Sequence, residues 1–94
     1  MLLGGIEFEI ITNLTKLPQK VASAMTALEN PELVGVSYKP LVYVGSQMVN
    51  GTNYHFIAKQ TLILKKSVQH IVKITVNESN GKYTIVKGSI EYIY

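Results

Sequence analysis

The chain has 94 residues, of which 47% are hydrophobic and 16% charged, and its net charge is +3 at pH 7. These totals indicate one small domain over residues 1–94, with a single core and little stability to spare. Cysteine is absent, which excludes a disulfide framework, a thiolate metal site and a cysteine nucleophile.

The charged residues are of two kinds only, because every basic residue is lysine and every acidic residue is glutamate. Arginine supplies the forked donor that reads phosphates and guanine edges, so its absence leads us to expect no nucleic-acid partner. The lysines are scattered, and only Lys65 and Lys66 are adjacent. Without aspartate a Ser-His-Asp triad cannot form. We therefore expect no enzyme, no metal site and no cofactor.

No apolar run approaches the roughly 20 residues that a transmembrane helix needs. The stretch from Met1 to Gly5 is too short for the apolar region of a signal peptide. We therefore expect no membrane partner, and a cytoplasmic location is favoured for the chain as written.

Two elements are predicted in the first third of the chain. Ile6, Phe8 and Ile10 alternate with glutamates, a period of two that is typical of a strand with one buried face. A helix is predicted over Pro18 to Glu29, and Asn30-Pro31 ends it because the residue before proline disfavours helical ψ. The apolar face of this helix consists of Leu17, Val21, Ala24, Met25 and Leu28.

The remainder is predicted to form strands joined by short turns. A second, irregular strand lies within Val34 to Val44, with a bulge or an edge position at Pro40 because proline cannot donate to a ladder. The next strands run over Thr52 to Leu64, His70 to Val76 and Tyr83 to Tyr94. In the third strand, the side chains predicted to share one face are those of Tyr54, Phe56 and Ala58.

The last strand changes the parity of its apolar positions at Gly88. A one-residue bulge there would bring two groups to one face, namely Tyr83 and Ile85 with Ile90, Tyr92 and Tyr94. Together the elements predict an α+β fold, in which one amphipathic helix is gripped by a four- to five-stranded curved antiparallel sheet in the order β-α-β-β-β-β.

The two histidines are predicted to be ordinary surface or sheet residues. If the chain reverses near Lys65-Lys66, His70 lies opposite Thr61, about 20 Å along the strand from His55. Two histidines alone also supply too few ligands for a metal ion.

The junction of the second and third strands carries the most specific pattern. Asn50-Gly51 between strand-like runs predicts a tight hairpin, whose central positions need φ > 0. Ser79-Asn80-Gly81-Lys82 predicts a second turn of the same Asn-Gly kind. Gln47 to Gly51 spell Q-x-V-x-G, and Thr52-Asn53-Tyr54 continue the pattern. By these residues, and by the order of its elements, the chain resembles the cystatins, and among them the disulfide-free, stefin-like members.

The resemblance implies a cystatin-like fold and a reversible, competitive inhibitor of papain-like cysteine proteases. In that family the contact edge has three segments: an N-terminal stretch around a glycine, the Q-x-V-x-G hairpin, and a second hairpin that often carries Pro-Trp. This chain departs from the pattern because it has no tryptophan. The implied protease-binding residues are Leu3, Gly4, Gln47, Met48, Val49, Asn50 and Gly51, with a weaker contribution from Asn80 and Gly81.

The resemblance also implies individual roles. Val49 would be the apolar contact at the tip of the first hairpin, and Gln47 and Gly51 would keep its shape. Leu3 or Leu2 would enter an apolar pocket of the protease, and the glycine would let the chain bend.

Two alternatives stay open. One is a non-inhibitory interaction module of the same fold that uses the sheet face or an edge strand, which exposure of Tyr38, Tyr43 or Tyr92 would favour. The other is a dimer that exchanges the first strand and the helix through the hairpin at Gln47 to Gly51, which is compatible with either function.

Overall fold

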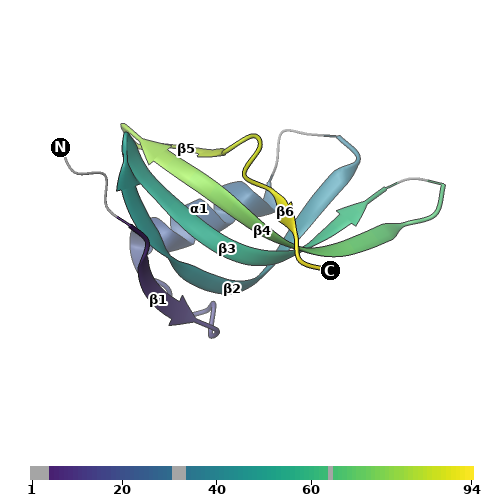
Figure 1. Ribbon diagram of the computed structural model, residues 1–94, viewed down its shortest axis with the longest axis horizontal. Helices are drawn as coiled ribbons and strands as arrows, with labels where there is room; N and C mark the ends of the chain where they lie inside the picture. Colours follow the sequence, from purple (N-terminus) through teal and green to yellow (C-terminus); the bar gives the residue numbers. More distant parts are fainter. Residues whose placement is uncertain (1–4, 31–33, 64) are drawn as a thin grey trace.

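The computed structural model describes residues 5–30, 34–63 and 65–94, and in them one helix packs against a curved antiparallel sheet (Figure 1). This is the α+β arrangement that the sequence predicts. The elements in chain order are β1 (Glu7–Ile11), α1 (Gln19–Glu29), β2 (Val36–Val49), β3 (Gly51–Leu62), β4 (Val68–Ser79), β5 (Lys82–Ile85) and β6 (Glu91–Tyr92).

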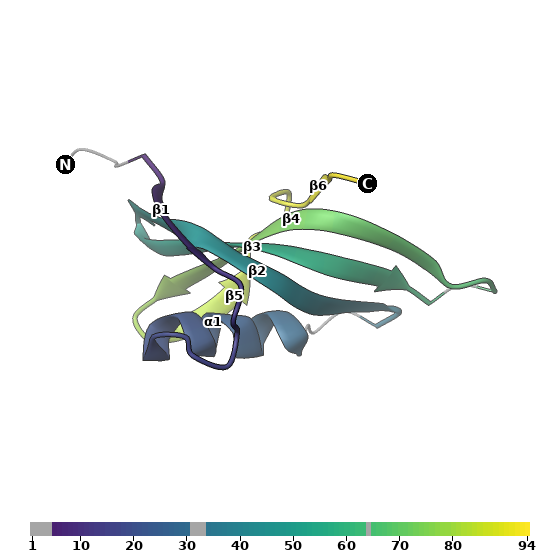
Figure 2. The ribbon, with the colours of Figure 1, turned by 90° about the horizontal axis from the view of Figure 1, so that it is seen from below.

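The sheet has the order β1-β2-β3-β4-β5, with β6 paired to β4 as well. Figure 2 shows α1 lying across one face of the sheet, which we call the helix face; no helix of the described residues covers the opposite, outer face. The described helix is 11 residues long, and no helix among these residues is long and apolar enough to span a membrane.

The core lies between α1 and the helix face. Val21, Ala24 and Leu28 are buried, and Leu17 and Met25 pack against the same cluster, as the helical period predicts. The aromatic rings of Tyr43 and Phe56 meet at 5.4 Å between centroids. The side chains that the sheet contributes to the buried core are Tyr38, Tyr43, Tyr54, Phe56, Ala58, Val72, Ile74 and Val76.

The helix begins directly after Pro18, which has the extended ψ of 151° typical of a residue that precedes a helix. It ends at Glu29, as predicted. Both the backbone N–H and the side-chain amide of Asn30 donate to the carbonyl oxygen of Thr26, which satisfies a free acceptor at this terminus. Pro31 lies outside the described residues.

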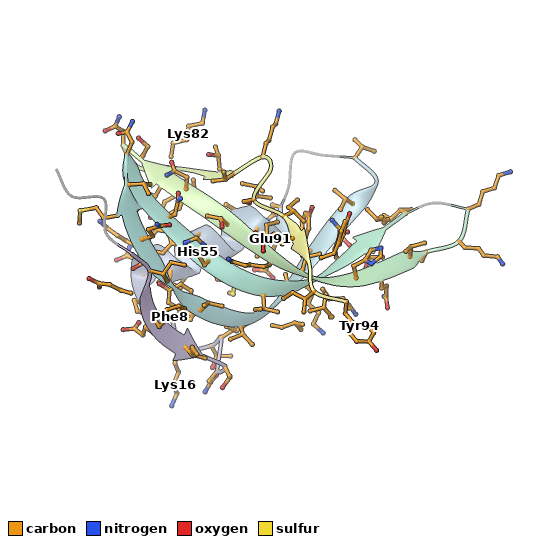
Figure 3. The ribbon with its side chains drawn as sticks, viewed as in Figure 1. Phe8, Lys16, His55, Lys82, Glu91 and Tyr94 are labelled. Carbon is orange, nitrogen blue, oxygen red and sulfur yellow. The ribbon has the colours of Figure 1, made fainter. Side chains whose placement is uncertain are left out.

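The first strand was predicted to bury Phe8 and Ile10, and this prediction is wrong. Phe8 and Ile10 are 71% and 68% exposed, and Figure 3 shows Phe8 at the border of the sheet. The β1–β2 register shifts between Phe8 and Ile11, so that Ile11 lies opposite Tyr43 and packs against the core. The strand forms as predicted, but β1 is an edge strand, and every residue from Glu7 to Ile10 is exposed.

Strands β2 and β4 are longer than predicted, because β2 continues to Val49 and β4 runs from Val68 to Ser79. The register of β2 against β3 shifts between Pro40 and Val42, which confirms the bulge predicted at the proline. The predicted end of the third strand, Leu64, lies outside the described residues.

The predicted last strand is broken into β5 and β6. From Ile85 to Tyr92 the chain advances seven residues, while their partners Val76 and Val72 are four apart, so three residues loop out rather than one. Gly88, within this loop, has a φ of +82°. Ile90 packs against the core. Tyr92 pairs with Val72 and Ile85 pairs with Val76, so the register places Tyr92 on the predicted face. Tyr92 and Tyr94 are nevertheless exposed and do not add to the buried core.

Candidate functional site

The first hairpin is tight, because Val49 lies opposite Gly51 and only Asn50 separates the two strands. Gly51 has a φ of +88°, whereas Asn50 is not among the residues with positive φ. The predicted turn with positive φ at both central positions is therefore wrong in detail, and glycine alone supplies the left-handed conformation.

Gly51 is held against the neighbouring strand. A Cβ atom at this position would collide with the backbone carbonyl oxygen of Glu78 and lie 3.4 Å from the Cα atom of Ser79. No larger residue fits there without movement of backbone atoms. The hairpin between β2 and β3 therefore lies directly beside the end of β4.

The side-chain amide of Asn77 on β4 holds this strand to β3 and to the first hairpin. Its Nδ2 atom donates to the side-chain oxygen of Asn53 at 2.8 Å and to the backbone carbonyl oxygen of Asn50 at 3.4 Å. Asn53 and Asn77 are direct partners in the β3–β4 register. Sequence reasoning missed Asn77, because only this register brings it to the first hairpin.

The second hairpin, between β4 and β5, has the predicted primed turn. Asn80 and Gly81 have φ values of 54° and 79°, the two positive values that an Asn-Gly turn provides. The backbone N–H of Gly81 donates to the carboxylate of Glu78 at 3.0 Å. A Cβ atom on Gly81 would meet nothing within 4 Å, so this turn projects freely from the sheet.

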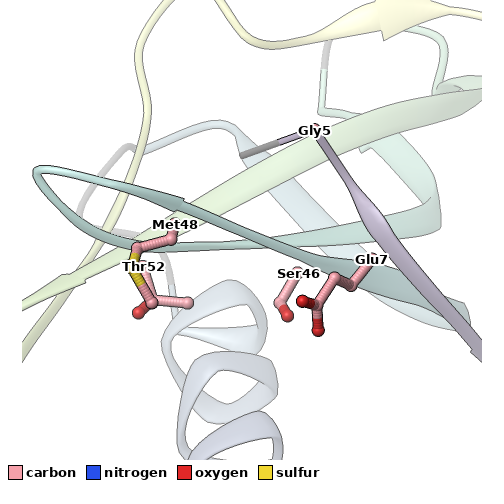
Figure 4. Close-up of a pocket in the computed structure, with 5 residues that line it drawn as sticks. All are labelled: Gly5, Glu7, Ser46, Met48 and Thr52. Atoms are coloured by element: carbon pink, nitrogen blue, oxygen red, sulfur yellow. The ribbon is translucent and has the colours of Figure 1, made fainter. Parts of the chain in front are cut away.

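A shallow hollow of about 250 Å³ lies between the start of the described chain and the first hairpin (Figure 4). Gly5 and Glu7 line one side of it, and Ser46, Met48 and Thr52 line the other. The N-terminal end of β1 therefore lies next to the hairpin. The predicted contact residues Leu3 and Gly4 are outside the described residues.

The exposed apolar side chain at the first hairpin is Met48, which is 63% exposed and lies opposite Thr52. Val49, which was expected to be the apolar contact, is half-buried, as is Gln47, while Asn50 is exposed. Met48 therefore offers more apolar surface to a partner than Val49 does.

Both hairpins and the start of β1 lie at one end of the sheet, on the left in Figure 1. We call this end the hairpin edge. The predicted contact residues that it gathers are Gln47, Met48, Val49, Asn50, Gly51, Asn80 and Gly81.

The chain was compared with protein-family models, with curated proteins and with solved structures. None of the three comparisons finds a match. The hairpin edge is therefore interpreted from its own residues and geometry.

The histidines differ in environment. His70 lies opposite Gln60 rather than Thr61, and its ring contacts that of Tyr92. His55 is buried within the sheet, where its Nδ1 atom is 2.9 Å from the hydroxyl oxygen of Thr75. Across residues 5–30, 34–63 and 65–94, no group of three or more His, Cys, Asp or Glu side chains is arranged to hold a metal ion.

The Nε2 atom of His55 has no hydrogen-bond partner among the described residues. Burial lowers the pKa of this imidazole, and the charge of Lys73 lowers the pKa further, because both disfavour the protonated form. His55 is thus a buried neutral side chain and not a surface residue.

Proposed function

We propose that this protein has a cystatin-like fold and is a reversible, competitive inhibitor of papain-like cysteine proteases, which it contacts through the hairpin edge. The observation that carries the proposal is the position of Gly51. The Q-x-V-x-G turn is packed against Glu78, so that the first and second hairpins form one continuous border beside the N-terminal end of β1.

Such an inhibitor would perform no chemistry and would bind by shape and by burial of apolar surface. A border held in one conformation before binding loses little entropy when it docks. Asn77 supports this rigidity because its amide joins Asn50 and Asn53 to β4. The hairpin edge would enter the protease cleft as a wedge and exclude peptide substrates from it.

The apolar contact in this proposal is shared between Met48 and Val49. Met48 supplies the larger exposed surface, and its flexible thioether adapts to irregular pockets. The second hairpin contributes only Asn80 and Gly81 at its tip, because it lacks the aromatic anchor that dominates many interfaces. Leu3 and Gly4 would add the contacts that the family resemblance implies.

The test is a titration of papain activity, on a small fluorogenic peptide, with increasing amounts of the protein. We expect competitive inhibition, and we expect Met48→Asp to raise the inhibition constant by about thirtyfold or more, because a charge would be buried at the interface centre. Ile63→Asp is a matched control, since Ile63 is equally exposed, at 63%, but lies just beyond the other end of β3. Fully active papain at micromolar protein would refute the proposal.

The alternative function is a non-inhibitory interaction module of the same fold. Tyr38 and Tyr43 are buried against the core, which counts for the inhibitor, whereas Tyr92 is exposed, as the module would require. The open apolar side chains of Phe8 and Ile10 on edge strand β1 also favour the module. Papain activity that is unchanged by the protein, together with a binding partner lost on Phe8→Asp, would favour this second function.

A further inference from the structure

The outer face of the sheet carries two cross-strand rows of side chains that contain both lysine and isoleucine. In the first row Lys39 on β2 lies opposite Lys59 on β3, and Lys59 lies opposite Ile71 on β4. In the second row Ile57 on β3 lies opposite Lys73 on β4. Three adjacent strands therefore contribute to one basic and apolar surface.

These side chains point away from α1. Successive side chains of a strand point to opposite faces, and the neighbours of Lys59 and Lys73, which are Ala58, Val72 and Ile74, are fully buried in the core. Figure 2 shows the face opposite α1 without a covering helix. On this face Lys39 is exposed and Ile57, Lys59, Ile71 and Lys73 are half-buried, whereas His55 and Thr75 further along the same face are buried. The part of the face that is accessible to a partner is therefore the part around Lys39.

The pairing of Lys39 with Lys59 is unfavourable in the free protein, because like charges directly opposite each other destabilise a sheet. The acidic residue in register with this surface is Glu91 on β6, which pairs with Lys73. Lys65 and Lys66 lie exposed in the connection between β3 and β4, beyond the ends of these strands. The arrangement leaves an excess of positive charge that an anionic partner would neutralise.

The apolar side chains among the lysines indicate that the anionic partner also offers hydrocarbon surface. Ile57 and Ile71 are half-buried. Ile93, whose backbone N–H donates to the carbonyl oxygen of Ile71, is 53% exposed. Soluble polyanions offer charge but little hydrocarbon, whereas the interface of a bilayer offers both. Lysines act as point charges rather than forks for individual groups, which suits a layer of lipid headgroups.

We propose that this outer face, centred on Lys39, Lys59, Lys73 and the neighbouring isoleucines, docks reversibly onto an anionic lipid surface. Each lysine near such a surface strengthens binding by about fivefold, and the isoleucines would enter the headgroup boundary. The inference goes beyond protease inhibition and does not depend on it. The sequence-based expectation of no membrane partner rests on the lack of a membrane-spanning segment. The proposal differs from it, because a protein can bind the surface of a membrane without spanning it.

The experiment is co-sedimentation of the whole protein with vesicles of phosphatidylcholine and phosphatidylserine, mixed roughly three to one, at low salt. Vesicles of phosphatidylcholine alone serve as the neutral reference. The double variant Lys39→Gln/Lys59→Gln removes the paired lysines, and Lys16→Gln/Lys20→Gln removes two exposed lysines before and on α1. Both variants lose two positive charges, so they separate the effect of position from that of net charge.

We expect binding to the anionic vesicles only, and a loss of about thirtyfold in the partition coefficient for Lys39→Gln/Lys59→Gln. The control variant should lose less than threefold. The first variant should remain folded, because it relieves a repulsive pair. Equal losses for both variants, or no binding by the unaltered protein, would overturn the proposal.

Soluble polyglutamate distinguishes a lipid surface from an acidic polypeptide. Ile93→Ser should weaken vesicle binding and leave polyglutamate binding unchanged, since Ile93 offers hydrocarbon contact and no charge. If polyglutamate binds more tightly than the vesicles and Ile93→Ser affects neither, the partner of this face is an acidic protein and the lipid proposal is wrong.

Discussion

The Cα atom of Gly51 lies so close to the backbone carbonyl of Glu78 that a methyl group between them would collide with the carbonyl oxygen. One glycine thereby fixes how the hairpin between β2 and β3 sits against β4. Gly81 in the second hairpin also has positive φ but has open space around it. A comparison of substitutions at these two glycines therefore distinguishes the cost of the left-handed backbone from the cost of steric crowding.

Gly51→Ala should destabilise the fold more than Gly81→Ala. The left-handed backbone costs a non-glycine residue about 1 kcal/mol at either position, and forcing a methyl group against Glu78 should add about 1–3 kcal/mol at Gly51 only. Urea unfolding of both variants measures the difference. Equal free energies of unfolding would show that the two hairpins are not packed as described.

Asn77→Ala should loosen the first hairpin without unfolding the protein. The variant removes the 2.8 Å hydrogen bond to Asn53 and the longer one to Asn50, which together should lower the free energy of unfolding by about 1 kcal/mol. The amide hydrogens of Gly51 and Thr52 should exchange faster than in the unaltered protein. Unchanged exchange at these amides would mean that Asn77 does not hold the hairpin.

Lys82→Trp should strengthen inhibition of papain. Lys82 is exposed at the start of β5, beside the turn that lacks an aromatic anchor, and it does not need positive φ. A tryptophan buried at the interface is worth about 2 kcal/mol in many complexes, so the inhibition constant should fall by about tenfold or more. Lys16→Trp, far from the hairpin edge, is the control and should leave the constant unchanged.

Stability should fall as the pH is lowered below about 6.5, the ordinary imidazole value, because of His55. Its pKa is lowered in the folded protein by burial and by Lys73, so below this pH the unfolded chain binds a proton that the folded protein resists. The loss grows until the pH reaches the folded-state pKa and is constant below it. Urea unfolding from pH 7 to pH 5 measures the slope of the free energy of unfolding against pH.

In His55→Gln the part of this slope that His55 contributes should vanish. Lys73→Gln should reduce it, because the charge that opposes protonation is removed while the burial remains. A slope that is the same in His55→Gln and in the unaltered protein would show that other groups cause the pH dependence.

The helix and the positions of β2, β3 and β4 in the chain follow from the sequence because their periods are clear. Val21, Ala24 and Leu28 repeat at helical spacing and are buried, and Phe56 and Ala58 share a buried face as predicted. Periodicity cannot tell whether a second layer covers a given face, and for this reason the burial of Phe8 and Ile10 was predicted wrongly.

The local chemistry of the hairpin edge was only partly predictable. The Asn-Gly turns were recognised from their residues, but the contact between Gly51 and Glu78 joins positions 27 residues apart and depends on the β3–β4 register. The same register brings Asn77 to Asn50. His55 is buried although it alternates with Tyr54 and Phe56, which are buried on the helix face, and a strand pattern does not reveal burial on both faces.

Edge strand β1 has a consequence for the folding equilibrium of the molecule. Phe8 and Ile10 leave most of their surface in water, and Ile11 is the residue of this strand that packs against the core. Detaching β1 therefore exposes little new apolar surface, so this local opening should cost far less free energy than global unfolding. When it opens, the edge of β2 becomes a template for the same segment of another molecule, and crowded solutions would favour such strand exchange.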